Sequence, residues 1–283
     1  EFLESKSSFK KNHFNLEIKQ CVSHEWNIWL LKNDFTKYNE FNVLDALNKD
    51  NTIVAAQFNH ILHYRVKPND KQYSDQWYHY NILNSTIDMD SEEAWDHITG
   101  GVNELGDTIA ICVIDGGIDF EHEEFQANIW RNSMEIAGNL LDDDKNGYID
   151  DVFGWNTFSQ SDQHSKDLHG TSVSGLAAAR GNNNIGITSN SWNTKLVFVT
   201  GGSDEANAIE SYTYPWKLRK TYNETNGTAG AFIVAVNSSW GRNNGKPDEA
   251  PLWCAVYDSL GNAGIVSVAA TANQSTNVDI YGD

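Results

Sequence analysis

The sequence is poor in several features that would define a class of protein. Its three cysteines, Cys21, Cys112 and Cys254, stand far apart, so a disulfide framework does not organise the fold. No apolar run approaches the length that crosses a bilayer, and we expect no membrane span. Lysine and arginine number 20 against 39 aspartates and glutamates, a formal net charge of −19. Such a surface repels phosphate backbones, which argues against a nucleic-acid partner.

The composition favours an ordered protein with a substantial core. Hydrophobic residues make up 40% of the chain, with 10 Trp, 11 Tyr and 12 Phe, which excludes wholesale disorder. A length of 283 residues suffices for one large domain and a smaller one. The acidic surface suits cation binding and an extracytoplasmic location, either secreted or in the cell envelope.

The chain changes character near residue 70. Residues 1–66 are rich in Lys and Asn, with a helical pattern at 41–49 and a strand pair or one long bent strand at 52–65. They predict a small α+β unit. Residues 66–77 cluster Pro, Asn, Asp and Lys, as exposed linkers do. We therefore expect domains at 1–70 and 71–283.

Short apolar runs alternate with helical stretches beyond residue 90. The runs at 108–115, 195–200, 231–237 and 264–270 predict an α/β fold with a buried parallel sheet. Ligands and chemistry gather at the carboxyl ends of such strands. Those ends contain Asp115-Gly116-Gly117, Gly201-Gly202, Asn237-Ser238-Ser239 and Ala272-Asn273.

Two titratable residues at this edge could act together. Asp115 follows a buried strand, although most Asp-Gly pairs only form turns. His169 opens a helix of small residues, where a lone histidine is more often a surface residue. The positive end of that helix would keep the imidazole neutral, as a general base requires. We expect the Asp115 carboxylate within about 2.6–3.2 Å of a His169 ring nitrogen.

These stretches resemble the subtilisin-like serine proteases, or subtilases, over roughly residues 75–283. "AICVIDGGID" and "HGTSVSGLAAA" look like the aspartate and histidine motifs of that family. "VNSSWG" looks like its substrate-edge strand, and "VSVAATAN" like the strand that leads to its oxyanion asparagine. The resemblance implies a subtilisin-like three-layer catalytic domain and a secreted serine endopeptidase that cleaves polypeptides. The first 66 residues resemble the remainder of the family's inhibitory propeptide.

The resemblance also implies a role for each matching residue. His169 would take the proton of a serine hydroxyl, and Asp115 would orient the imidazole. The Asn273 amide would donate to the tetrahedral oxyanion. The edge along which an extended peptide lies would be formed by Ser239, Trp240 and Gly241.

A second constellation, "DDDKNGYIDD" at 142–151, is typical of a calcium loop. Acidic and amide residues alternate around Gly147, which permits a sharp turn. Position 12 of the loop is Phe153 instead of a bidentate glutamate, so a paired EF-hand is not expected; the alternative is a solvated acidic turn. Similar loops recur in subtilases. The predicted Ca²⁺ ligands are Asp142, Asp144, Asn146, the Tyr148 carbonyl and Asp150.

The nucleophile is the missing part of this pattern. Ser172 lies three residues after His169, but the histidine motif already accounts for it. In the resembling family the serine comes last, on another helix, and Ser275 is not at a helix start. We therefore expect the catalytic serine on a second chain or a C-terminal continuation, with the catalytic domain incomplete here. The alternatives are a catalytically inactive subtilase-fold scaffold and a calcium-dependent binding component.

Overall fold

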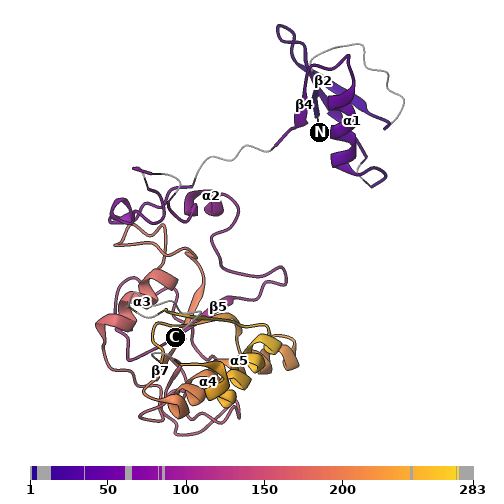
Figure 1. Cartoon of the computed structure of the whole chain (residues 1–283). Helices are drawn as coiled ribbons and strands as arrows, with labels where there is room; N and C mark the ends of the chain where they lie inside the picture. The colour runs from indigo at the N-terminus through magenta and orange to yellow at the C-terminus, as the bar shows by residue number, and fades with distance from the viewer. Residues whose placement is uncertain are drawn as a thin grey trace. The chain divides into compact units, whose positions relative to one another are not determined.

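The computed structural model describes residues 2–4, 14–34, 36–60, 66–81, 83–84, 87–242, 245–271 and 273. The chain divides into two compact units, Glu1–Tyr64 and Arg65–Asp283 (Figure 1).

The first unit is an antiparallel sheet with one helix packed on it. Its elements are β1 (Phe2–Glu4), β2 (Glu17–Ser23), β3 (Ile28–Lys32), α1 (Glu40–Lys49) and β4 (Ala56–Phe58), with strand order β2-β3-β1-β4. Asn39 caps the start of α1, where its side chain accepts two backbone N–H groups. The helix buries Val43 and Leu47. These two pack against Leu31 of β3 and the apolar residues around it.

The helix predicted at 41–49 is present, whereas only part of the strand pair or long bent strand predicted over 52–65 forms among the described residues. Only Ala56–Phe58 is a strand, and residues 61–65 lie outside the described part of the chain. The Asp50 carboxylate accepts from the backbone N–H and hydroxyl of Thr52. This turn uses the residues that the apolar pattern had assigned to a strand.

The second unit carries the α/β fold that the apolar runs predict. In chain order it contains η1 (Tyr73–Asp75), α2 (Ser91–Trp95), β5 (Ile109–Asp115), β6 (Trp155–Asn156), α3 (Leu168–Ala178), β7 (Lys195–Thr200), α4 (Glu205–Thr225), β8 (Phe232–Ser238), η2 (Pro247–Glu249), α5 (Pro251–Ala263) and β9 (Val266–Ala269).

Its sheet is parallel throughout and has the strand order β6-β7-β5-β8-β9. Strand β5 is central, with Asp115 opposite Thr200 of β7 and Ile114 opposite Ser238 of β8. The four predicted apolar runs therefore form four adjacent strands. All their carboxyl ends lie at one edge, where the sequence predicted the chemistry.

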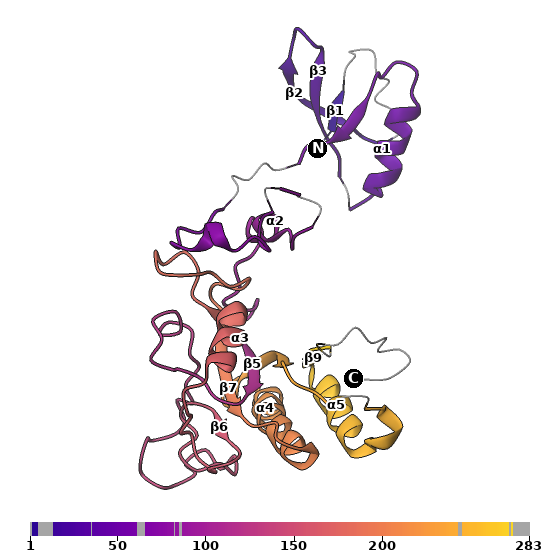
Figure 2. The ribbon, with the colours of Figure 1, turned by 60° about the vertical axis from the view of Figure 1, so that its left-hand side comes forward.

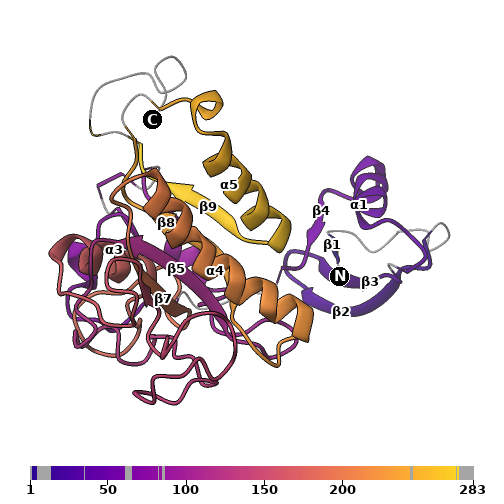
Figure 3. The same ribbon diagram turned by 90° about the horizontal axis from the view of Figure 1, so that it is seen from below.

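Helices cover both faces of this sheet. Cys112 and Ile114 of β5 pack in the core that α4 and α5 cover, whereas Val113 packs in the core that α3 covers. This alternation follows from the two-residue period of a strand. Figures 2 and 3 show α4 and α5 side by side along one face, with α3 across the sheet from them.

Strand β9 differs from its neighbours because its residues are exposed. Val266 and Val268 are 64% and 48% exposed, although β9 pairs with β8 along its length. Among the described residues, no helix is both long and apolar enough to cross a membrane.

Two leucines of α5 test how this helix packs. Leu260 is fully buried and Leu252 is 75% exposed. We expect Leu260→Ala to lower the free energy of unfolding by about 2–5 kcal/mol, because it leaves a cavity in the core. Leu252→Ala should change it by less than about 0.5 kcal/mol. Denaturant unfolding measures both, and equal losses would contradict the packing of α5.

Candidate active site

The carboxyl end of β5 holds Asp115 in a buried position. This residue is only 4% exposed. Its backbone carbonyl accepts the N–H of Gly201 at the end of β7, at 3.0 Å. Its carboxylate accepts the N–H of Gly116 at 2.8 Å. Both backbone and side chain are therefore fixed before any contact with the histidine.

Helix α3 brings His169 to the same edge. The helix begins at Asp167, whose side chain accepts the N–H of Gly170 at 2.9 Å. Gly170 permits a close approach to β5, because a Cβ there would lie 2.1 Å from the Gly117 carbonyl oxygen and 3.0 Å from the Asp115 Cβ. Any other residue at this position would push α3 away from the end of the strand.

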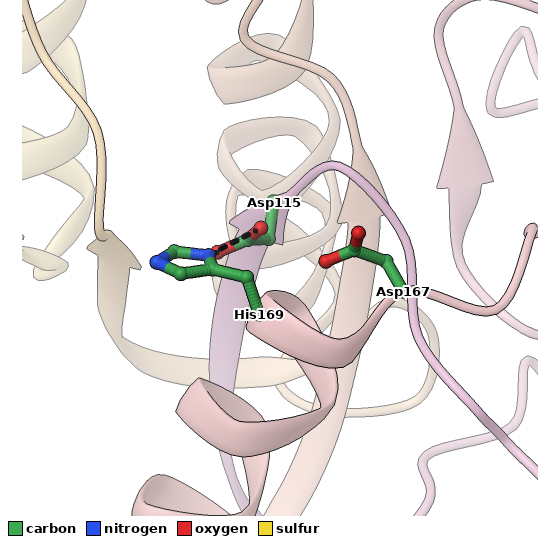
Figure 4. A group of neighbouring side chains, drawn as sticks. All are labelled: Asp115, Asp167 and His169. Carbon is green, nitrogen blue, oxygen red and sulfur yellow. Dashed lines mark hydrogen bonds and ion pairs between the residues drawn. The ribbon is translucent and has the colours of Figure 1, made fainter.

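The two side chains meet as the sequence predicts. The Nδ1 atom of His169 lies 2.9 and 3.0 Å from the two carboxylate oxygens of Asp115 (Figure 4). Because a carboxylate can only accept, Nδ1 carries the proton and Nε2 is the basic nitrogen. Nε2 is at the end of the ring that points away from Asp115 (Figure 4), and the histidine side chain is 61% exposed. The pair can thus accept a proton from a group that arrives from outside.

The helix end is not the only charge that acts on this imidazole. The hydrogen bond to Asp115 and the charge of that carboxylate raise the pKa of His169, and the charge of Asp167 adds to this. A raised pKa favours the protonated imidazole, a direction opposite to the effect of a helix N-terminus.

Asp167 is the third member of this group. The polar side-chain atoms of Asp115, Asp167 and His169 lie within 4.8 Å of one another. Figure 4 shows Asp167 on the side of Asp115 away from the imidazole ring. Because the Asp167 carboxylate caps α3 through Gly170, its role is to hold the start of the helix.

Ser172, the nearest candidate nucleophile in sequence, faces its own helix. Its hydroxyl donates to the Leu168 carbonyl at 2.8 Å. Asn273 follows β9 and is exposed; within the described residues it makes no hydrogen bond to Asp115 or His169. Ser275 lies outside the described residues.

The predicted substrate edge begins where β8 ends. The Ser239 hydroxyl accepts from the side chain of Asn237 at 3.1 Å, and Gly241 is exposed. The Trp240 side chain instead turns inward and donates from Nε1 to the Ile114 carbonyl at 2.8 Å. A cavity of about 250 Å³ separates Trp240 and Gly241 from Ala269–Thr271, the stretch that leads towards Asn273.

The predicted calcium loop is folded around its acidic side chains, but these do not all converge. The Asp142 carboxylate accepts the N–H groups of Asn146 and Gly147. The Asp150 carboxylate instead accepts those of Asn139 and Leu140. The Tyr148 N–H donates to the Asn146 side chain.

Carboxylates do converge at one point, where Asp144 meets two residues that the sequence analysis missed. Oxygens of Glu135, Asp144 and Asp151 lie within 4.8 Å of one another. Glu135 and Asp151 are buried, and burial raises the pKa of Asp151 to about 7. None of the three pairs with a lysine or arginine among the described residues. This group could hold a divalent cation, whose charge would compensate the buried carboxylates.

Asp151 could have been identified from the sequence, because it ends the acidic run at 142–151. Glu135 carries no such signal. Its carboxylate accepts the backbone N–H groups of Asp144 and Asp150, a contact that only the folded loop creates.

Comparison with known proteins agrees with the geometry of this edge. The family model described as "Subtilase family" matches residues 106–282, a span that contains Asp115, His169 and Asn273. The chain belongs to the subtilase family.

Proteins of known sequence match shorter segments of the chain. "Subtilisin-like protease 1" of Plasmodium falciparum (isolate 3D7) is 46% identical over 89 residues, which are 31% of this chain and 13% of that protein. "Thermophilic serine proteinase" of Bacillus sp. (strain AK1) is 30% identical over 159 residues, 56% of this chain and 31% of that protein. The matches thus cover less than a third of these relatives.

A solved structure from Pseudoalteromonas arctica PAMC 21717, described as proteases, gives a TM-score of 0.47 at 22% identity. The alignment covers 72% of this chain and 58% of that one.

Substitution of Asp115 tests the charge pairing in this subtilase. In Asp115→Asn we expect the pKa of His169 to fall towards its ordinary value of about 6.5, as measured by NMR titration of the ring protons. A raised pKa in the folded state stabilises the fold fully below about pH 6.5, and this stability is lost as pH rises through the folded-state pKa. Asp115→Asn should therefore destabilise the protein more at pH 5.5 than at pH 9.

The matched control for that substitution is Asp167→Asn. Asparagine caps a helix as well as aspartate does, and Asp167 is the smallest contributor to the raised pKa of His169. An equal fall in the His169 pKa in both variants would contradict the assigned pairing.

Proposed function

We propose that this subtilase is a secreted serine endopeptidase that hydrolyses peptide bonds through an Asp/His/Ser triad. The observation that carries the proposal is the contact of Asp115 with Nδ1 of His169, which leaves Nε2 as an accessible base. The membership of the family supports the reaction type.

In this mechanism, Nε2 of His169 removes the proton of a serine hydroxyl as that oxygen attacks the peptide carbonyl. The Asp115 carboxylate holds the ring in the tautomer with Nδ1 protonated and stabilises the imidazolium that forms. Nε2 then donates the proton to the amine that leaves. The Asn273 side chain donates a hydrogen bond to the negatively charged oxygen of the tetrahedral intermediate.

The serine belongs, in this proposal, to a segment outside the described residues, on a second chain or a C-terminal continuation. Two observations support this placement. No hydroxyl of the described residues hydrogen-bonds to Nε2 of His169, and the Ser172 hydroxyl is bonded within α3. The exposed valines of β9 offer a surface on which such a segment would pack.

The substrate is a polypeptide in extended conformation along Ser239–Gly241. A strand added there would bond to the backbone beyond the end of β8. The cavity lined by Trp240, Gly241 and Ala269–Thr271 lies beside this edge, so it would receive a substrate side chain.

The first unit is proposed to be the propeptide that inhibits the enzyme before processing. Its small α+β architecture, with four antiparallel strands and one helix, agrees in class with the domain expected at 1–70. The processing site would then lie after this unit, in the stretch predicted to be a linker.

Ca²⁺ is the proposed cofactor of the acidic loop. Glu135, Asp144 and Asp151 would hold the ion at their point of convergence; of the acidic ligands predicted from the sequence, only Asp144 is among them. The ion would link the 142–151 loop to Glu135 and so stabilise this part of the fold; it takes no part in the proton transfers.

The first test uses a fluorophosphonate probe, which acylates only an activated serine. We expect the 283-residue chain alone to remain unlabelled, because in this proposal the attacking serine lies on another segment. The native full-length protein should be labelled on a serine outside this 283-residue sequence, and His169→Ala should abolish the label while Ser172→Ala retains it.

Peptide mapping after denaturing separation identifies the labelled residue. Label on Ser172 would overturn the assignment of the nucleophile. No label on any segment of the native protein would favour the inactive scaffold or the calcium-dependent binding component.

Calcium binding predicts a dependence of stability on the free ion. At a calcium concentration 100 times Kd, binding to the native state adds about 2.7 kcal/mol, so a chelator should lower Tm by about 5 °C or more. Calorimetry measures the change, and Asp144→Asn should reduce it. Asp258→Asn, an exposed position on α5, is the control and should keep the full change. A chelator that leaves Tm unaltered would exclude the site.

A further inference from the structure

Trp240 connects the substrate edge to the strand that carries Asp115. Its indole Nε1 donates to the carbonyl oxygen of Ile114 at 2.8 Å, across 126 positions of sequence. Ile114 is fully buried, and its carbonyl belongs to the peptide group whose nitrogen is that of Asp115. The bond therefore fixes the plane of the peptide that enters Asp115.

The indole is held in place by its neighbours. Gly202 has a φ of +98°, and a Cβ there would lie 2.5 Å from Cε2 of Trp240, so the ring lies flat against the glycine backbone. The Tyr212 ring centroid is 6.1 Å from that of Trp240. The Tyr212 hydroxyl in turn bonds to that of Ser238 at 2.7 Å. The donor is thus preorganised rather than free to rotate.

The peptide group that follows Asp115 is fixed by β7, the strand on the other side of β5. The Asp115 carbonyl accepts the N–H of Gly201, which follows β7. Asp115 consequently lies between two fixed carbonyls, one bonded from the β8 side and one from the β7 side. Its carboxylate can then keep both of its bonds, to the Gly116 N–H and to His169.

We propose that Trp240 is a positioning residue for the catalytic pair, and that its indole N–H sets the orientation of Asp115 towards His169. The proposal rests on the assignment of Asp115 and His169 to a protease triad. It gives the inward side chain of the substrate edge a function apart from peptide binding. Removal of the donor leaves a buried carbonyl without this partner, and the end of β5 relaxes away from His169.

The test compares two tryptophan substitutions in the 283-residue chain. NMR titration measures the pKa of His169 in each variant. Trp240→Phe keeps a large ring and removes the N–H. Trp253→Phe makes the same change nearby, where the indole nitrogen has no hydrogen-bond partner among the described residues. Both charged groups that face His169, Asp115 and Asp167, are retained in each variant.

We expect Trp240→Phe to lower the pKa of His169 by about 0.5 unit or more, and Trp253→Phe to leave it at the wild-type value. His169→Gln assigns the resonance. A wild-type titration in Trp240→Phe, or an equal shift in both variants, would overturn the proposal, because a loss of packing alone affects both rings.

A second measurement needs no variant. In the unaltered chain, the Trp240 indole N–H should exchange with deuterium more slowly than that of Trp253, which is buried without an acceptor. Equal or faster exchange would contradict the bond to Ile114. Neither readout requires proteolysis, so failure of the protease proposal in the probe experiment is distinguishable from failure of this one.

Discussion

The parallel pairing of β5 on both of its sides is the constraint on which the candidate site depends. Because β7 and β8 run in the same direction as β5, their carboxyl ends place Gly201 and the substrate edge on either side of Asp115. The strand is buried on both faces, so its end cannot move without disturbing the two cores that α3, α4 and α5 close. Close packing around the end of β5 therefore restricts the orientation of the buried Asp115 carboxylate.

Helix α3 converts that rigid end into a proton-accepting pair. The approach at Gly170 brings the helix against the Gly117 backbone, and the Asp167 cap sets where the helix begins. His169 then reaches Asp115 from the solvent side. Nδ1 bonds to a buried carboxylate and Nε2 remains accessible, as general base catalysis requires.

The acidic composition has a local counterpart in the loop that contains Asp144. A net charge of −19 is spread over the whole chain, and here three carboxylates, two of them buried, converge without a lysine or arginine partner among the described residues. Repulsion among Glu135, Asp144 and Asp151 opposes folding of the loop unless a proton or a cation compensates it. Burial is the main cause of the raised pKa of Asp151, which favours its protonated form; Ca²⁺ is the cation that we propose in place of that proton.

The four main strands and the helix at 41–49 could be predicted from sequence because burial imposes a short-range apolar period. The meeting of Asp115 with His169 could be predicted because parallel topology places all strand ends at one edge. The short extent of the strand expected over 52–65 could not be predicted in this way, because the turn at Asp50 uses the first of these residues.

The sequence by itself determined which residue types stand at the active edge and in what order. Only the tertiary structure decided that the Trp240 indole bonds to Ile114 and that Glu135 joins Asp144 and Asp151. It also decided that the Asp115 carboxylate bonds to Nδ1 of His169 and raises the pKa of that imidazole. Local patterns record burial and propensity, whereas hydrogen bonds and charge coupling depend on distances between residues far apart in the chain, which exist only once the sheet has formed.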